Sequence, residues 1–93
     1  MEANARAHVI IHGRVQGVCF RMETRKAARQ FGAAGWVCNL PDGNVEAVLE
    51  GPREAVEALL NWCGHGPRLA RVDKLDVTRE VYVGEYDSFE VTY

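Results

Sequence analysis

The stretch AHVIIHGRVQGVCFRMETRKAARQFG, residues 7–32, contains three consecutive patterns that set the architecture. Ala7, Val9 and Ile11 alternate with other residues at a period of two, which predicts a strand over 7–13. A loop with Gly13 and Gly17 follows. Steps of three and four then predict an amphipathic helix that Gly32 ends, with the stripe Phe20, Thr24, Ala27, Ala28 and Phe31.

The next segment reads as two strands joined by a tight turn. Residues 34–39 form a strand around Trp36 and Val37. The turn is 40–43, where Asp-Gly supplies the positive φ that a hairpin needs. Residues 44–50 form the following strand. Its apolar face predicts one buried side, made by Val45, Ala47 and Leu49.

The remaining third of the chain continues the alternation of helix and strand. Pro52 suits the first position of a second helix, which Gly64 ends. A fourth strand is expected near 70–79, with a bulge where its apolar phase slips between Val72 and Leu75. The stripe of the second helix is Val56, Leu59, Leu60 and Cys63, and the closing strand is marked by Phe89, Val91 and Tyr93.

This order predicts an α+β fold, the ferredoxin-like split βαβ sandwich, written βαββαβ plus a short C-terminal strand. We expect an antiparallel sheet with two helices on one face. At 93 residues the chain has room for one domain, spanning 1–93. The helices should cover Val9, Ile11, Val45, Ala47 and Leu49.

Net charge, apolar runs and cysteine spacing indicate which partners and which cellular compartment to expect. The net charge of −2 argues against a nucleic-acid partner bound through its phosphates. No signal peptide and no membrane-spanning run is visible. Cys19, Cys38 and Cys63 have no metal-site or disulfide-framework spacing, which fits free thiols in a reducing compartment. We therefore expect a cytoplasmic monomer with no membrane partner.

Topology places two distant segments together and predicts an anion site there. The first two strands run parallel with the third between them, so their carboxyl ends emerge at one edge, about 10 Å apart. One end leads into the loop before the first helix, where free N–H groups and the helix dipole attract an anion. Arg21 can add a two-pronged, charged grip, and Asn39 lies at the other strand end. The loop N–H groups we expect to contribute belong to Gln16, Gly17, Val18, Cys19 and Phe20.

These residues carry a family resemblance. GRVQGVCFR (13–21), GWVCN (35–39) and the D-G-x-V-E pattern at 42–46 together closely resemble the acylphosphatase family. The resemblance extends over nearly the whole chain. It implies that Arg21 binds the phosphate and that Asn39 orients the attacking water. It also implies hydrolysis of a carboxyl-phosphate anhydride, so that the substrate is a small acyl phosphate and inorganic phosphate is a product.

The residues are compatible with that reaction without a metal or other cofactor. A carboxylic acid with a pKa of roughly 4 leaves as an anion and needs no general acid. The loose phosphoryl transition state can be stabilised by positioning and electrostatics, and the side chain of Asn39 can orient a water although it cannot act as a base. His8 and His12 lie about 13 Å apart along one strand face, too far for one metal ion, and His65 stands alone in a loop.

Three other interpretations remain open from the sequence. Cys19 and Arg25 have the C-x-x-x-x-x-R spacing of cysteine-dependent phosphatases, but the five residues between them fall in the helical pattern. RNA-recognition modules share the βαββαβ plan, but they need aromatic residues on the open sheet face. That face instead carries Glu46 and Glu50, which we expect to be solvated. The third interpretation is a non-catalytic regulatory domain of the same fold.

Overall fold

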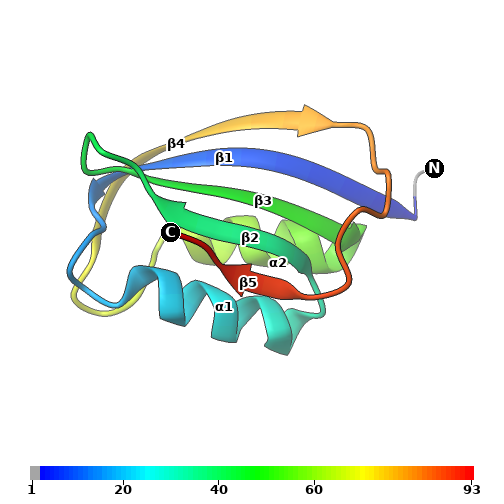
Figure 1. The fold of residues 1–93 in the computed structure, drawn as a ribbon, viewed down its shortest axis with the longest axis horizontal. Helices are drawn as coiled ribbons and strands as arrows, with labels where there is room; N and C mark the ends of the chain where they lie inside the picture. Colours follow the sequence, from blue (N-terminus) through cyan, green and yellow to red (C-terminus); the bar gives the residue numbers. More distant parts are fainter. Residues whose placement is uncertain (1–2) are drawn as a thin grey trace.

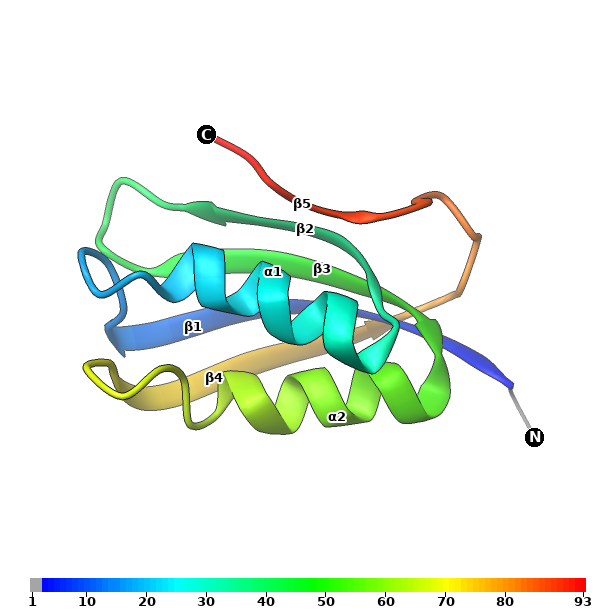
Figure 2. The same cartoon turned by 90° about the horizontal axis from the view of Figure 1, so that it is seen from below.

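The computed structural model describes residues 3–93 and has the expected ferredoxin-like plan. Figures 1 and 2 show a curved sheet with both helices packed on one side of it. The fold class predicted from the sequence is confirmed. In chain order the elements are β1 (Asn4–Arg14), α1 (Phe20–Phe31), β2 (Ala34–Asn39), β3 (Val45–Pro52), α2 (Arg53–Cys63), β4 (Arg71–Glu80) and β5 (Phe89–Val91).

The sheet order β4-β1-β3-β2-β5 places β3 between β1 and β2, as the topology predicted. β3 pairs antiparallel with both neighbours, so β1 and β2 run parallel to each other. β5 adds to the outside of β2 in parallel, which makes the complete sheet mixed. The segment between β4 and β5 crosses the sheet at the end where β4 stops and β2 begins, so β5 starts beside the start of β2 and runs parallel to it (Figure 1).

The bulge predicted in the fourth strand is present, and it lies opposite Gly13. Val72 pairs with Gly13 and Lys74 pairs with His12, so Asp73 is the extra residue of β4. Gly13 has φ 135°, and a Cβ there would collide with the carbonyl oxygen of Arg71. A glycine is therefore required where β1 leads into the loop that follows it.

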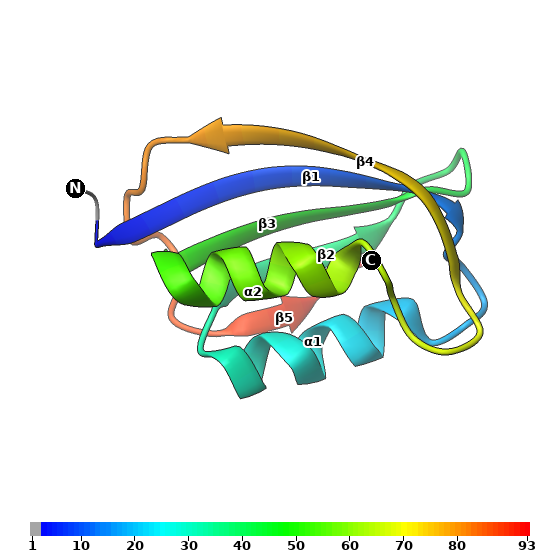
Figure 3. The same ribbon diagram turned by 180° about the vertical axis from the view of Figure 1, so that it is seen from behind.

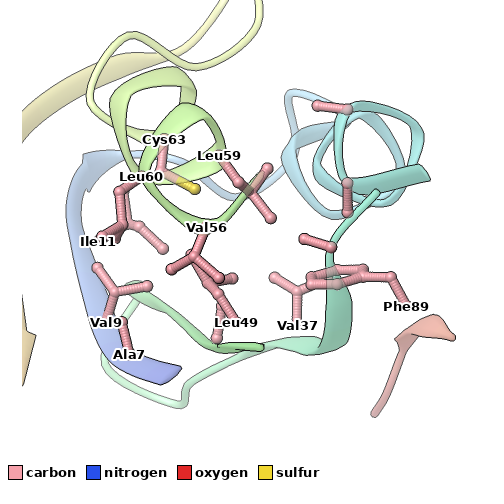
Figure 4. Packing of buried hydrophobic residues seen from close by; sticks show 14 of the residues in the cluster. Ala7, Val9, Ile11, Val37, Leu49, Val56, Leu59, Leu60, Cys63 and Phe89 are labelled. Atoms are coloured by element: carbon pink, nitrogen blue, oxygen red, sulfur yellow. The ribbon is translucent and has the colours of Figure 1, made fainter. Parts of the chain in front are cut away.

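The core fills the space between the helices and the sheet. Figure 3 shows these elements from behind, and Figure 4 shows buried side chains of the core from close by. The predicted stripe of α2 is buried, and so is that of α1 up to Ala28. Phe31 was predicted to belong to the α1 stripe but is 36% exposed, because the helix ends there beyond the edge of the core. The sheet residues predicted to lie under the helices are fully buried: Val9, Ile11, Val45, Ala47 and Leu49.

The prediction that Glu50 is solvated is wrong. Its strand position faces away from the helices, yet the residue is only 1% exposed. The segment between β4 and β5 folds over this part of the open face. Backbone N–H groups of residues 83–86 donate to the Glu50 carboxylate at 2.8 to 3.3 Å. Arg6 adds a charged hydrogen bond of 3.2 Å. A buried carboxylate with these partners joins β3 to the segment that leads into β5.

These contacts determine the ionisation of Glu50. Burial alone raises the pKa of its carboxyl, but the N–H of Val83, the guanidinium of Arg6 and the N–H groups of Tyr86 and Glu85 outweigh burial. Together they hold the pKa below its ordinary value of 4.5. A depressed folded-state pKa means that the stabilisation is complete above the unfolded-state value and is lost as pH falls through the folded-state value.

We predict that Glu50→Gln lowers the free energy of unfolding by about 3 kcal/mol at pH 7, because four N–H donors and Arg6 lose a charged acceptor. Urea titration measures the change. The matched control is Glu46→Gln on the same strand face, where the carboxylate is only partly buried and contacts His8. The gap between wild type and Glu50→Gln should shrink as pH falls below about 4.5. An equal loss of unfolding free energy in the two variants would contradict the role of Glu50 as a buried, charged acceptor.

Candidate active site

The loop between β1 and α1 has the backbone shape of an anion-binding turn. Gly17 has φ 74° and Cys19 has φ 62°, so two left-handed residues lie within three positions. Such turns direct successive N–H groups to one side. Within residues 3–93, the N–H groups of Gln16 to Phe20 donate to no carbonyl or side-chain oxygen. The donors predicted from the sequence are therefore available to a ligand.

The N-terminus of α1 adds further N–H donors and a positive dipole end beside the loop. Glu23 N–H donates to the carbonyl of Cys19 at 3.0 Å, the bond that closes the first helical turn. Cys19 is the N-cap, and its side chain makes no capping hydrogen bond. The N–H groups of the first turn are thus left without a capping side chain, and the positive end of the helix dipole points at the loop.

The side chain of Gln16 connects the loop to the β2–β3 hairpin. Its Nε2 donates to the carbonyl oxygens of Leu40 and Asn44, each at 2.8 Å. The sequence predicts only a backbone role for Gln16, and this side-chain role is an additional finding of the structure. The contacts span more than twenty positions along the chain, and no local pattern in the sequence marks them.

Asn39 is the last residue of β2 and faces the loop. It lines a hollow of about 320 Å³ together with Arg21 and residues of the loop. Its Oδ1 is buried and has no hydrogen-bond partner among residues 3–93. A buried acceptor without a partner costs roughly 1–3 kcal/mol, which is recovered when a donor such as water fills the hollow. The complete lining is Val15, Gln16, Gly17, Cys19, Phe20, Arg21, Met22 and Asn39.

Arg21 brings a positive charge to the same hollow. It makes no ion pair with a carboxylate in the part of the chain that the structure describes. Its guanidinium lies 5.0 Å from the centre of the Tyr93 ring, a cation–π contact. The Tyr93 ring carries no charge, so this contact leaves the guanidinium unneutralised. Tyr93 was expected in the closing strand, but β5 ends at Val91 and Tyr93 lies beyond it.

Val18 is the predicted loop residue whose side chain does not line the hollow. It is nearly buried and faces the other side of the loop, toward Trp62. Phe20 is also buried, and its ring packs against that of Trp62 with centroids 5.6 Å apart. Both side chains therefore anchor the loop to the core, while their N–H groups donate to no oxygen of residues 3–93.

The hollow contains no arrangement for thiolate attack. Arg25 lies beyond its lining, and its Nη2 is directed at the Sδ of Met22, 3.9 Å away. The residues from Phe20 to Arg25 are helical, so they cannot wrap a phosphate as a loop. The cysteine-dependent interpretation has no support in this geometry.

The open face of the sheet has histidine–carboxylate contacts between neighbouring strands. His8 contacts Glu46 and His12 contacts Asp76, each at 2.7 Å, so the two histidines have separate partners. Within residues 3–93 no group of three or more His, Cys, Asp or Glu side chains is arranged to hold a metal. A larger hollow of about 430 Å³ lies at the far end of β1, where Arg6 and Arg79 are already paired with carboxylates.

The ferredoxin-like fold and the hollow that Arg21 and Asn39 line are compatible with a small α+β enzyme that acts on a phosphoryl group. The sequence model of the acylphosphatase family matches residues 7–91. An acylphosphatase from Syntrophus aciditrophicus is 54% identical over 88 residues, covering 95% of this chain and 92% of that protein. An acylphosphatase structure from Coxiella burnetii has a TM-score of 0.90 at 38% identity, covering 96% of this chain and 93% of that one. An acylphosphatase structure from Bacillus subtilis has a TM-score of 0.91 at 32% identity, covering 96% of this chain and 99% of that one.

The chain belongs to the acylphosphatase family, and its function is that of an acylphosphatase, a hydrolase of acyl phosphates. No helix among residues 3–93 is long and apolar enough to cross a membrane.

Cys19 adopts a left-handed conformation that costs a non-glycine residue about 1–2 kcal/mol. We predict that Cys19→Gly raises the free energy of unfolding by about 0.5 kcal/mol, because relief of strain slightly exceeds the added chain entropy of glycine. Cys19→Val should lower it by more than 1 kcal/mol, since a β-branched side chain tolerates this region poorly. Urea midpoints measure both changes. A Cys19→Val protein as stable as wild type would show that the loop is unstrained.

Proposed function

We propose that this acylphosphatase holds the phosphoryl group with Arg21 and the loop N–H groups while Asn39 directs a water in line. The observation that carries the proposal is the buried, unpartnered Oδ1 of Asn39 in the same hollow as the unneutralised guanidinium of Arg21. One group can accept a hydrogen bond from a water and the other can bind an anion. The shared hollow allows both to act on one phosphorus atom.

The phosphate end of the substrate meets a preorganised positive surface. Arg21 offers two parallel N–H donors to two phosphate oxygens, and N–H groups of Gln16 to Phe20 meet the others. These donors need no rearrangement as charge shifts during the reaction. The loose transition state spreads negative charge over the peripheral oxygens, where the donors act most strongly.

The attacking water accounts for the position of Asn39. Its Oδ1 accepts a hydrogen bond from the water and aims the oxygen lone pair at phosphorus. The new O–P bond forms as the bond to the acyl oxygen breaks, and the carboxylate leaves with the electron pair. The water protons pass to the phosphate and to solvent. The mechanism involves no covalent enzyme intermediate and no metal ion.

The experiment that tests this mechanism is hydrolysis of acetyl phosphate in the presence of a chelator. Turnover above the spontaneous rate is expected, and its complete loss on chelation would contradict a metal-free reaction. Cys19→Gly, which has no thiol, should retain turnover, whereas a covalent mechanism would be abolished by it.

For the phosphate grip, we predict that Arg21→Ala lowers kcat/KM by at least about a thousandfold, because one charged donor pair is removed from the transition state. Arg21→Lys should recover little, since an ammonium group cannot supply two parallel donors. Competition by inorganic phosphate should weaken in both variants. Arg25→Ala, four positions along the same helix and outside the hollow, is the matched control.

For the water, we predict that Asn39→Ala lowers kcat by roughly a hundredfold or more, while inhibition by inorganic phosphate stays within about threefold of wild type. The amide acts on the water and leaves the phosphate contacts in place. Steady-state kinetics with acetyl phosphate measure both quantities. An unchanged kcat would remove Asn39 from the mechanism.

The same proposal extends to the organisation of the protein in the cell. We propose that residues 1–93 form one domain that acts as a cytoplasmic monomer, without nucleic-acid or membrane partners. The free thiols Cys19, Cys38 and Cys63 fit a reducing compartment. The charged residues along β4 disfavour pairing of this edge strand with a second copy.

A further inference from the structure

The loop between β1 and α1 borders a second groove on the side away from Asn39. This groove has a volume of about 450 Å³, and residues of the loop before β4 form its outer wall. Cys19 lines both this groove and the phosphate hollow, so the two spaces adjoin at one residue. The lining residues are Val18, Cys19, Glu23, Trp62, Pro67, Arg68 and Leu69.

The surface of this groove is largely apolar. Val18, Trp62 and Leu69 provide aliphatic and aromatic walls, and Leu69 is 73% exposed. An isolated exposed leucine is ordinary, but here it completes a concave apolar wall beside an anion site. The two charged residues, Glu23 and Arg68, have opposite signs, so the groove has no net charge to select an ionic ligand.

The outer wall is held in shape against the core. Gly66 N–H donates to the carbonyl of Trp62 at 2.8 Å, and Ala70 N–H donates to that of Pro67 at 2.9 Å. Gly66 has φ 71°, and a Cβ there would meet the ring of Phe20. The groove is therefore built by ordered backbone that packs on the residue next to Arg21.

The loop separates this groove from the water side of the hollow. Gln16 is bonded to the hairpin that follows Asn39, whereas Val18 faces the groove. Figure 2 shows the same order: the β2–β3 hairpin, the β1–α1 loop and the α2–β4 loop follow one another across one end of the molecule. A phosphoryl group on the loop thus has Asn39 on one side and the groove on the other.

In-line displacement requires the attacking and leaving oxygens to lie on opposite sides of phosphorus. With the water beside Asn39, the leaving carboxylate must point away from it, toward the shared residue Cys19 and the groove. We propose that this groove binds the acyl part of the substrate and favours uncharged apolar acyl groups, with Leu69 as a specificity-determining residue. The inference rests on the proposed placement of the water at Asn39.

The test compares a small acyl phosphate with a large apolar one. Wild-type protein is first assayed with acetyl phosphate, whose methyl group is too short to extend along the groove. Leu69→Ser should then lower the ratio of kcat/KM for benzoyl phosphate to that for acetyl phosphate by about fivefold, because apolar contact with the ring is lost. The exposure of Leu69 makes the substitution compatible with folding, which the thermal midpoint verifies.

The matched control is Val81→Ser, since Val81 is also an exposed aliphatic residue, 82% exposed, beyond the far end of β4. It should leave the ratio unchanged. A Leu69→Ser protein with an unchanged ratio, or with an equal loss for both substrates, would overturn the acyl groove. Failure of wild-type protein to hydrolyse acetyl phosphate would instead refute the proposed mechanism, so the two failures are distinguishable.

Discussion

The pairing of β3 with both of its neighbours is the constraint on which the site depends. Val45 lies opposite Ile11 of β1 and opposite Asn39 of β2, so one buried residue sets the relative position of both strand ends. A shift of one residue in either register would turn alternate side chains to the other face, exposing the apolar row beneath the helices. The burial of the core and the geometry of the hollow are therefore set by the same hydrogen bonds.

Each wall of the site is anchored by a contact that has a structural purpose of its own. The Gln16 side chain ties the loop to the hairpin, and the rings of Phe20 and Trp62 fix the loop to the core. The side chains bury themselves, and the backbone N–H groups remain at the surface. Preorganisation of this kind is what the proposed mechanism requires, because a rate that relies on no catalytic base or metal depends on donors already in place.

The proposed placement of the substrate accounts for the uneven charge of the two spaces beside the loop. The phosphate hollow has an unneutralised guanidinium and free N–H donors, whereas the adjoining groove has apolar walls and charges that cancel. An acyl phosphate with an uncharged, apolar acyl group has the same asymmetry, because its negative charge lies on the phosphoryl group. The division between the two spaces falls at Cys19, where the backbone turns through its left-handed conformation.

Local pattern in the sequence determined the elements, the fold class and the two ends that meet at the site. Periodicity, Gly13, Gly17 and the Asp-Gly turn act through neighbouring residues, and their physical effects can be read without the rest of the chain. Only the tertiary structure decided the burial of Glu50, the exposure of Phe31 and the side-chain contacts of Gln16. Glu50 has the strand position of a solvated residue, yet a segment more than thirty residues away covers it with N–H donors. Such contacts depend on which distant backbone segments lie nearby in the folded chain, and local hydrophobic periodicity does not predict them.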